Sequence, residues 1–160
     1  MGMAIALREL HRSEGHLLHQ LLALVERHRD EPEIHHVAGD LATWSREHVR
    51  ELAATGPRYG LEPEDLSEGG PEPLGGTRED PGEPLDTRSD PDLLLLADLR
   101  RLYRMAAGVS VDWELLGQGA QALADTELLA LTRRCHPQTV RQMNWADGML
   151  KALSPQVLSG

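Results

Sequence analysis

Four ionisable side chains, Glu14, His48, Glu114 and His136, lie on helical faces that are otherwise largely apolar. Glu14 sits in a stripe of leucines that recurs at helical spacing, and His48 sits in a similar apolar stripe. A carboxylate and an imidazole buried at such places can form an ion pair or a hydrogen bond, or they can ligate a metal ion. The sequence leaves both interpretations open.

The spacing of Glu14 and His48 places them at the same depth if their helices form an antiparallel hairpin. The turn is expected near residue 31, with Glu14 about 17 residues before it and His48 about 17 residues after it. Because the helical rise is the same in both directions, the two side chains then lie at one height. Burying either one unpaired is costly, so we expect each to be the partner of the other.

Glu114 and His136 repeat this arrangement about a turn near residue 124. Glu114 lies about ten residues before that turn and His136 about twelve after it. We expect both to point inward, on faces whose remaining members are Leu96, Leu99, Tyr103, Ala106 and Ser110 on one helix and Leu129, Thr132, Val140, Met143 and Leu150 on the other.

The elements that would hold these residues are four helices in one domain, residues 1–160. They are expected at about 4–29, 32–56, 92–122 and 126–153. Pro137 predicts a kink or break in the fourth helix near His136. Residues 61–91 are acidic and rich in proline and glycine, which is typical of a linker. This connection of about thirty residues is long enough to run the length of a bundle, so it predicts a crossover between the second and third helices.

The order Glu, His, Glu, His on four such helices resembles the ferritin-like superfamily. That resemblance implies an all-α four-helix bundle with one long crossover and a di-iron site. In the family, one glutamate comes from each of helices one and three, matched here by Glu14 and Glu114. A Glu-x-x-His pair comes from each of helices two and four, and its histidines are matched by His48 and His136. The glutamates of those pairs would stand at positions 45 and 133, where this chain has Ser45 and Arg133.

Two functional hypotheses follow from this incomplete motif. The first is a ferritin-like protein with a degenerate metal site, non-enzymatic, acting in interaction or small-ligand binding. The second is a metal-dependent redox protein that holds one iron or manganese ion between Glu14, His48, Glu114 and His136. The cofactor expectation is therefore no metal or one such ion, and the absence of carboxylates at Ser45 and Arg133 favours the first hypothesis.

Composition excludes several other classes of protein. The formal net charge of -10 argues against nucleic-acid and membrane-surface partners. The single cysteine, Cys135, rules out an internal disulfide and suggests a reducing compartment, so we expect a cytoplasmic protein. No signal peptide or membrane span is expected. Lys151 is the only lysine, which we interpret as GC-rich coding bias, and we expect a bacterial protein.

We also expect either a homodimer formed through the third and fourth helices, or the crossover packed over those two helices. Several large apolar residues fall off the inner faces assigned above, and apolar residues on an outer face suggest a protein contact surface. They are Trp113, Leu116, Leu131, Trp145 and Met149.

Overall fold

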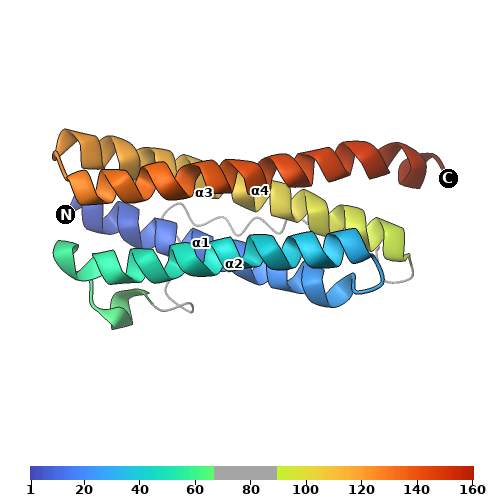
Figure 1. Ribbon diagram of the computed structural model, residues 1–160, viewed down its shortest axis with the longest axis horizontal. Coiled ribbons are helices and arrows are strands. Elements are labelled where there is room, and N and C mark those ends of the chain that lie inside the picture. Colours follow the sequence, from blue (N-terminus) through green and yellow to red (C-terminus); the bar gives the residue numbers. More distant parts are fainter. Residues whose placement is uncertain (67–89) are drawn as a thin grey trace.

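The computed structural model describes residues 1–66 and 90–160, and all regular secondary structure within them is helical. Four long helices lie lengthwise beside one another: α1 (Gly2–Arg27), α2 (Pro32–Thr55), α3 (Pro91–Ala122) and α4 (Thr126–Ser159) (Figure 1). Two short 3-10 helices, η1 (Gly56–Tyr59) and η2 (Pro63–Leu66), follow α2. The all-α prediction is confirmed for these residues. Residues 67–89, which hold most of the predicted crossover, lie outside them.

The helices pair as two hairpins that pack through α1 and α3. Ser13 in α1 is bonded to Asp112 late in α3, and His28 just after α1 is bonded to Asp98 early in α3, so these two helices are antiparallel. Short turns connect α1 to α2 and α3 to α4 (Figure 1). It follows that α2 and α3 run in the same direction, and that α2 ends and α3 begins at opposite ends of the molecule.

Local sequence explains where α2, α3 and α4 begin. The side chain of Asp90 accepts hydrogen bonds from the backbone of Asp92 and Leu93, and that of Asp125 accepts one from the backbone of Leu128. Pro32 occupies the first turn of α2, where its missing N–H costs nothing. These caps satisfy amide groups that have no partner inside the helix.

The α4 helix runs unbroken through Pro137, so of the predicted kink or break near His136 the break is wrong, and the kink stays a prediction. An internal proline costs about 3 kcal/mol through one lost hydrogen bond and a steric clash. Buried residues on both sides of Pro137, among them Cys135, Thr139 and Gln142, pack α4 against the other helices. We infer that this packing outweighs the local cost and keeps the helix continuous.

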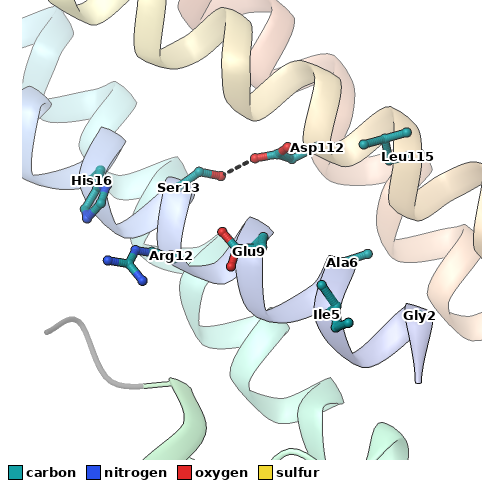
Figure 2. Close-up of a pocket in the computed structure, with 9 residues that line it drawn as sticks. All are labelled: Gly2, Ile5, Ala6, Glu9, Arg12, Ser13, His16, Asp112 and Leu115. Atoms are coloured by element: carbon teal, nitrogen blue, oxygen red, sulfur yellow. Dashed lines mark hydrogen bonds between the residues drawn. The ribbon is translucent and has the colours of Figure 1, made fainter. Parts of the chain in front are cut away.

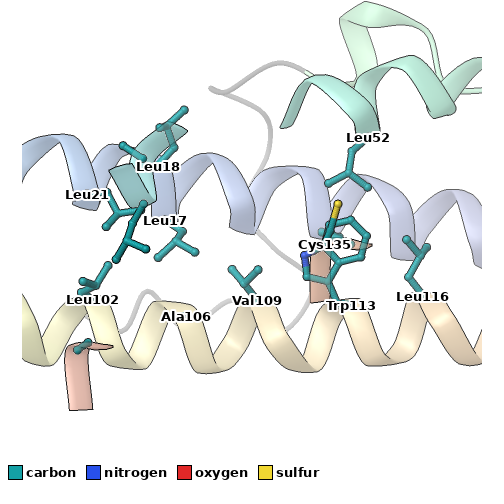
Figure 3. Close-up of a cluster of buried hydrophobic side chains, with 14 of the residues drawn as sticks. Leu17, Leu18, Leu21, Leu52, Leu102, Ala106, Val109, Trp113, Leu116 and Cys135 are labelled. Atoms are coloured by element: carbon teal, nitrogen blue, oxygen red, sulfur yellow. The ribbon is translucent and has the colours of Figure 1, made fainter. Parts of the chain in front are cut away.

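The inner face of α3 differs from the predicted one. It follows an alternating three- and four-residue step, and the seven buried residues are Leu99, Leu102, Ala106, Val109, Trp113, Leu116 and Ala120. Figure 3 shows the part of this series from Leu102 to Leu116. The predicted face took two consecutive steps of four at its end. Each step of four turns about 40° beyond a full circle, so that face drifted away from the core by Glu114.

The same error affects the residues on which the homodimer prediction rested. Trp113, Leu116 and Leu131 are buried in the core, and Trp145 and Met149 are partly buried and pack against it. They do not form an outer apolar face. The homodimer stays a prediction, but these residues no longer argue for it.

Polar contacts lock both ends of the bundle. At one end, the carboxylate of Asp98 accepts from Arg27 Nη1 and pairs with His28 Nε2, each at 2.7 Å. At the other, Arg58 and Tyr59 in η1 donate to the Asp125 carboxylate, which caps α4. These two donors hold the pKa of Asp125 at about 2. The locks fix α1 against α3, and the end of α2 against the α3–α4 turn.

That turn generates a prediction about stability. Ala124 has φ 54, a left-handed conformation that a side chain disfavours and glycine accepts. Ala124→Gly should raise the free energy of unfolding by about 0.5–1 kcal/mol, measured by urea denaturation. Ala53→Gly, at an exposed position inside α2, is the control and should lower it by about 1 kcal/mol. A loss of stability in Ala124→Gly would contradict the assigned turn.

Candidate functional site

The predicted meeting of Glu14 and His48 is confirmed. His48 Nδ1 lies 2.7 Å from Glu14 Oε2, and the two side chains are 1% and 0% exposed. α1 and α2 bring them to one depth because both lie on the inward faces of an antiparallel hairpin. A fully buried carboxylate therefore has a cationic partner, as the cost of charge burial requires.

Residues from α3 and α4 complete this central cluster. Trp113 Nε1 donates to the same Glu14 oxygen at 2.8 Å, and the rings of Trp113 and His48 form a T-shaped pair. On the other side, His48 Nε2 donates to Gln138 Oε1 at 2.7 Å. Both imidazole nitrogens thus face acceptors, which suits a doubly protonated ring. Glu14, His48, Trp113 and Gln138 come from four different helices.

The surroundings keep His48 charged over the physiological range. Burial of the ring lowers the pKa of His48, but Cys135 and Glu14 together act more strongly in the opposite direction and raise it from 6.5 to about 10. The chemistry of the cluster is therefore that of a buried carboxylate–imidazolium pair.

Glu114 does not join this cluster, contrary to the sequence prediction. It is exposed on α3, one position after the buried Trp113, and so lies about 100° further around the helix. His136 is half-buried and its Nε2 lies 2.9 Å from Ser110 Oγ. The inner face of α4 is likewise displaced by one residue, so that Cys135, not His136, enters the core.

The two positions that depart from the ferritin-like motif have different environments. Ser45 is buried, and its hydroxyl accepts a hydrogen bond from Gln142 Nε2 at 2.9 Å. Arg133 is exposed, so its charge does not enter the bundle. At position 45 neutral side chains from α2 and α4 therefore meet, whereas the residue at position 133 lies outside the bundle.

The predicted metal-ligand set does not fit a metal ion in this arrangement. Across residues 1–66 and 90–160, no three His, Cys, Asp or Glu side chains gather in a way that could hold one. Glu14 and His48 could supply two metal ligands, but their facing atoms are hydrogen-bonded to each other. Within this pair, Glu14 Oε1 is buried without a hydrogen-bond partner.

A second feature lies just outside the central cluster, along the seam of α1 and α3. A hollow of about 490 Å³ is lined by residues of both helices, and a neighbouring hollow of about 470 Å³ shares Ser13, His16 and Asp112 with it. Figure 2 shows α1 supplying Glu9 and Ser13 and α3 supplying Asp112, with the Ser13 hydroxyl donating to Asp112 Oδ2 across the seam at 2.8 Å.

Sequence reasoning missed Trp113, Gln138, Cys135 and this seam. An alternating three- and four-residue register starting from Leu99 would have placed Trp113 inside, since it is the only aromatic residue in that series. Gln138 carried no comparable signal, because an amide on the flank of a helix is ordinarily exposed. Asp112 also gave no signal in the sequence, because its contact with Ser13 on α1 is visible only in the structure.

Comparison with known proteins returned no match to the chain, either among protein-family models, curated protein sequences or solved structures. Among the described residues, no helix has both the length and the apolar character needed to cross a membrane. Function must therefore be argued from the site itself.

The central pair predicts strong coupling in a double-mutant cycle. Glu14→Leu and His48→Leu should each lower the free energy of unfolding by about 3–5 kcal/mol, because each strands a buried charge. The double Leu variant should lose much less than the sum. The same cycle on the exposed pair Glu47–Arg50 is the control and should show coupling below about 0.5 kcal/mol. Additive losses at Glu14 and His48 would show that the two do not interact.

The raised pKa of His48 predicts how stability depends on pH. Between pH 6.5 and about 10 the folded chain holds a proton on His48 that the unfolded chain has released. This contribution is complete below pH 6.5 and is lost as pH rises through 10, at about 1.4 kcal/mol per pH unit. Urea denaturation across this range should show that slope in the native chain and not in the double Leu variant. Equal slopes in the two proteins would contradict a charged His48.

Proposed function

We propose that the chain is a ferritin-like four-helix bundle with a degenerate metal site, and that it acts non-enzymatically, as a binding protein for a small ligand. The observation that carries this proposal is the central Glu14–His48 pair. Trp113 donates to Glu14 Oε2 and Gln138 accepts from His48 Nε2, so the pair is bonded to all four long helices and stabilises the bundle from within.

The parallel directions of α2 and α3 support the ferritin-like part of the proposal. Helices that run this way need a connection spanning the bundle, and the family has a crossover between the same two helices. The chain offers residues 67–89 for it. The family's metal chemistry is not supported to the same degree, because Ser45 and Arg133 replace its bridging carboxylates and Glu114 is exposed.

The seam between α1 and α3 supports the ligand-binding part. Its two adjoining hollows have the volume typical of small-molecule sites and combine apolar and charged side chains. The central pair, by contrast, has no adjoining hollow among those described, so we place the ligand at the seam.

Metal content separates this proposal from the redox alternative. Protein prepared without an affinity tag or chelator should contain less than about 0.1 equivalent of iron or manganese, and adding either ion should leave the melting temperature unchanged. The double variant with Glu14→Leu and His48→Leu is the control. About one equivalent of metal in the native chain, absent from this variant, would overturn the proposal and favour the redox alternative.

A further inference from the structure

The hollow at the α1–α3 seam carries two carboxylates that form no ion pair with any side chain of residues 1–66 and 90–160. Glu9 and Asp112 are both half-buried and line the same hollow from opposite helices. The polar partner of Asp112 is the neutral hydroxyl of Ser13. Two basic residues, Arg12 and His16, also line the hollow from α1, and Figure 2 shows the Arg12 guanidinium directed away from Asp112.

The electrostatic environment of Asp112 favours a cation. Partial burial raises the pKa of Asp112, the hydroxyl of Ser13 opposes this, and the charges of Glu9 and Glu14 raise it further. A carboxylate whose charge is disfavoured by burial and by like charges gains most from a positive group placed beside it. A positive group placed beside Asp112 would therefore be favoured on the α3 side of the hollow.

Apolar side chains adjoin these carboxylates. Ile5, Ala6 and Leu115 line the same hollow, and Leu115 is 61% exposed. A leucine so exposed beside a hollow offers surface that an apolar ligand group would remove from water. The hollow therefore joins an anionic end to an apolar wall.

We propose that the α1–α3 seam binds a small organic cation, an amine with an apolar body, whose ammonium group lies between Glu9 and Asp112 and whose body covers Ala6 and Leu115. This inference rests on the proposed function, since it names the chemical class of the ligand. The ammonium group donates hydrogen bonds to both carboxylates, while the Ser13 hydroxyl continues to hold Asp112 in place.

The test is a titration of the full chain followed through its backbone amide signals in ¹H–¹⁵N NMR spectra. The probe is 2-phenylethylammonium, with neutral 2-phenylethanol and anionic phenylacetate as matched controls. Only the ammonium compound should shift the amides of Glu9, Ser13 and Asp112 in a saturable way. Asp112→Asn should weaken its binding about tenfold or more, as expected for a lost charged hydrogen bond.

Asp40→Asn is the matched variant, because it removes one negative charge from an exposed position on α2 and should leave binding unchanged. Equal weakening in the two variants would overturn the proposal by showing non-specific attraction to an acidic protein. Saturable binding of phenylethanol or phenylacetate instead would overturn the cation assignment and leave the ligand-binding function standing. Seam shifts that appear on raising the protein concentration, with no response to the amine, would assign the surface to a second copy and overturn it as well. The metal measurement above tests the proposed function independently.

Discussion

The burial of the Glu14 carboxylate is the constraint around which the bundle is arranged. A fully buried carboxylate is tolerated only when it is paired and hydrogen-bonded, and here each partner comes from a different helix. His48 on α2 supplies the charge, Trp113 on α3 donates a second hydrogen bond, and Gln138 on α4 accepts the remaining proton of the imidazole. A slip of any one helix by a turn would break at least one of these bonds. We infer that the cluster selects one register among the many that leucine packing alone would permit.

Leucine-rich faces distinguish poorly between alternative registers of two helices, because one leucine can take the place of another with little change in packing. A glycine further restricts the possible registers at one point of the α3–α4 contact. A Cβ atom on Gly117 would come within 2.9 Å of Thr132 Cγ2, so the two helices approach more closely there than any other residue would allow. The polar contacts of Asp98 and Asp125 at the two ends of the bundle also restrict the register. Specific polar contacts thus set the register, and apolar burial supplies most of the driving force.

The sequence was sufficient to predict four helices, the order of the two hairpins and the meeting of Glu14 with His48. Helical period, turn residues and the rise per residue determine those features locally. The prediction that Glu114 and His136 point inward was wrong because the rotation of their helices was misjudged. The rotation of a long helix about its axis depends on all its neighbours, and an error of one residue turns a side chain by about 100°. On α1 and α2 the charged residue lay within a continuous apolar face. On α3, Glu114 lay at the end of a predicted face that drifted from the core, and on α4 the predicted face was displaced by one residue.

The core and the seam are connected by consecutive residues. Ser13 is bonded to Asp112, and the next residue on each helix forms the next contact, Glu14 to Trp113. Because neighbouring residues diverge by about 100°, the first of these contacts lies at the surface hollow and the second in the core. Glu14 also raises the pKa of Asp112 through its charge. A positive group at the seam would therefore lower the pKa of Asp112, whereas the charge of Glu14 raises it. Asp112 at the seam and Glu14 in the core are thus linked by the repulsion of their charges and by adjacent contacts between α1 and α3.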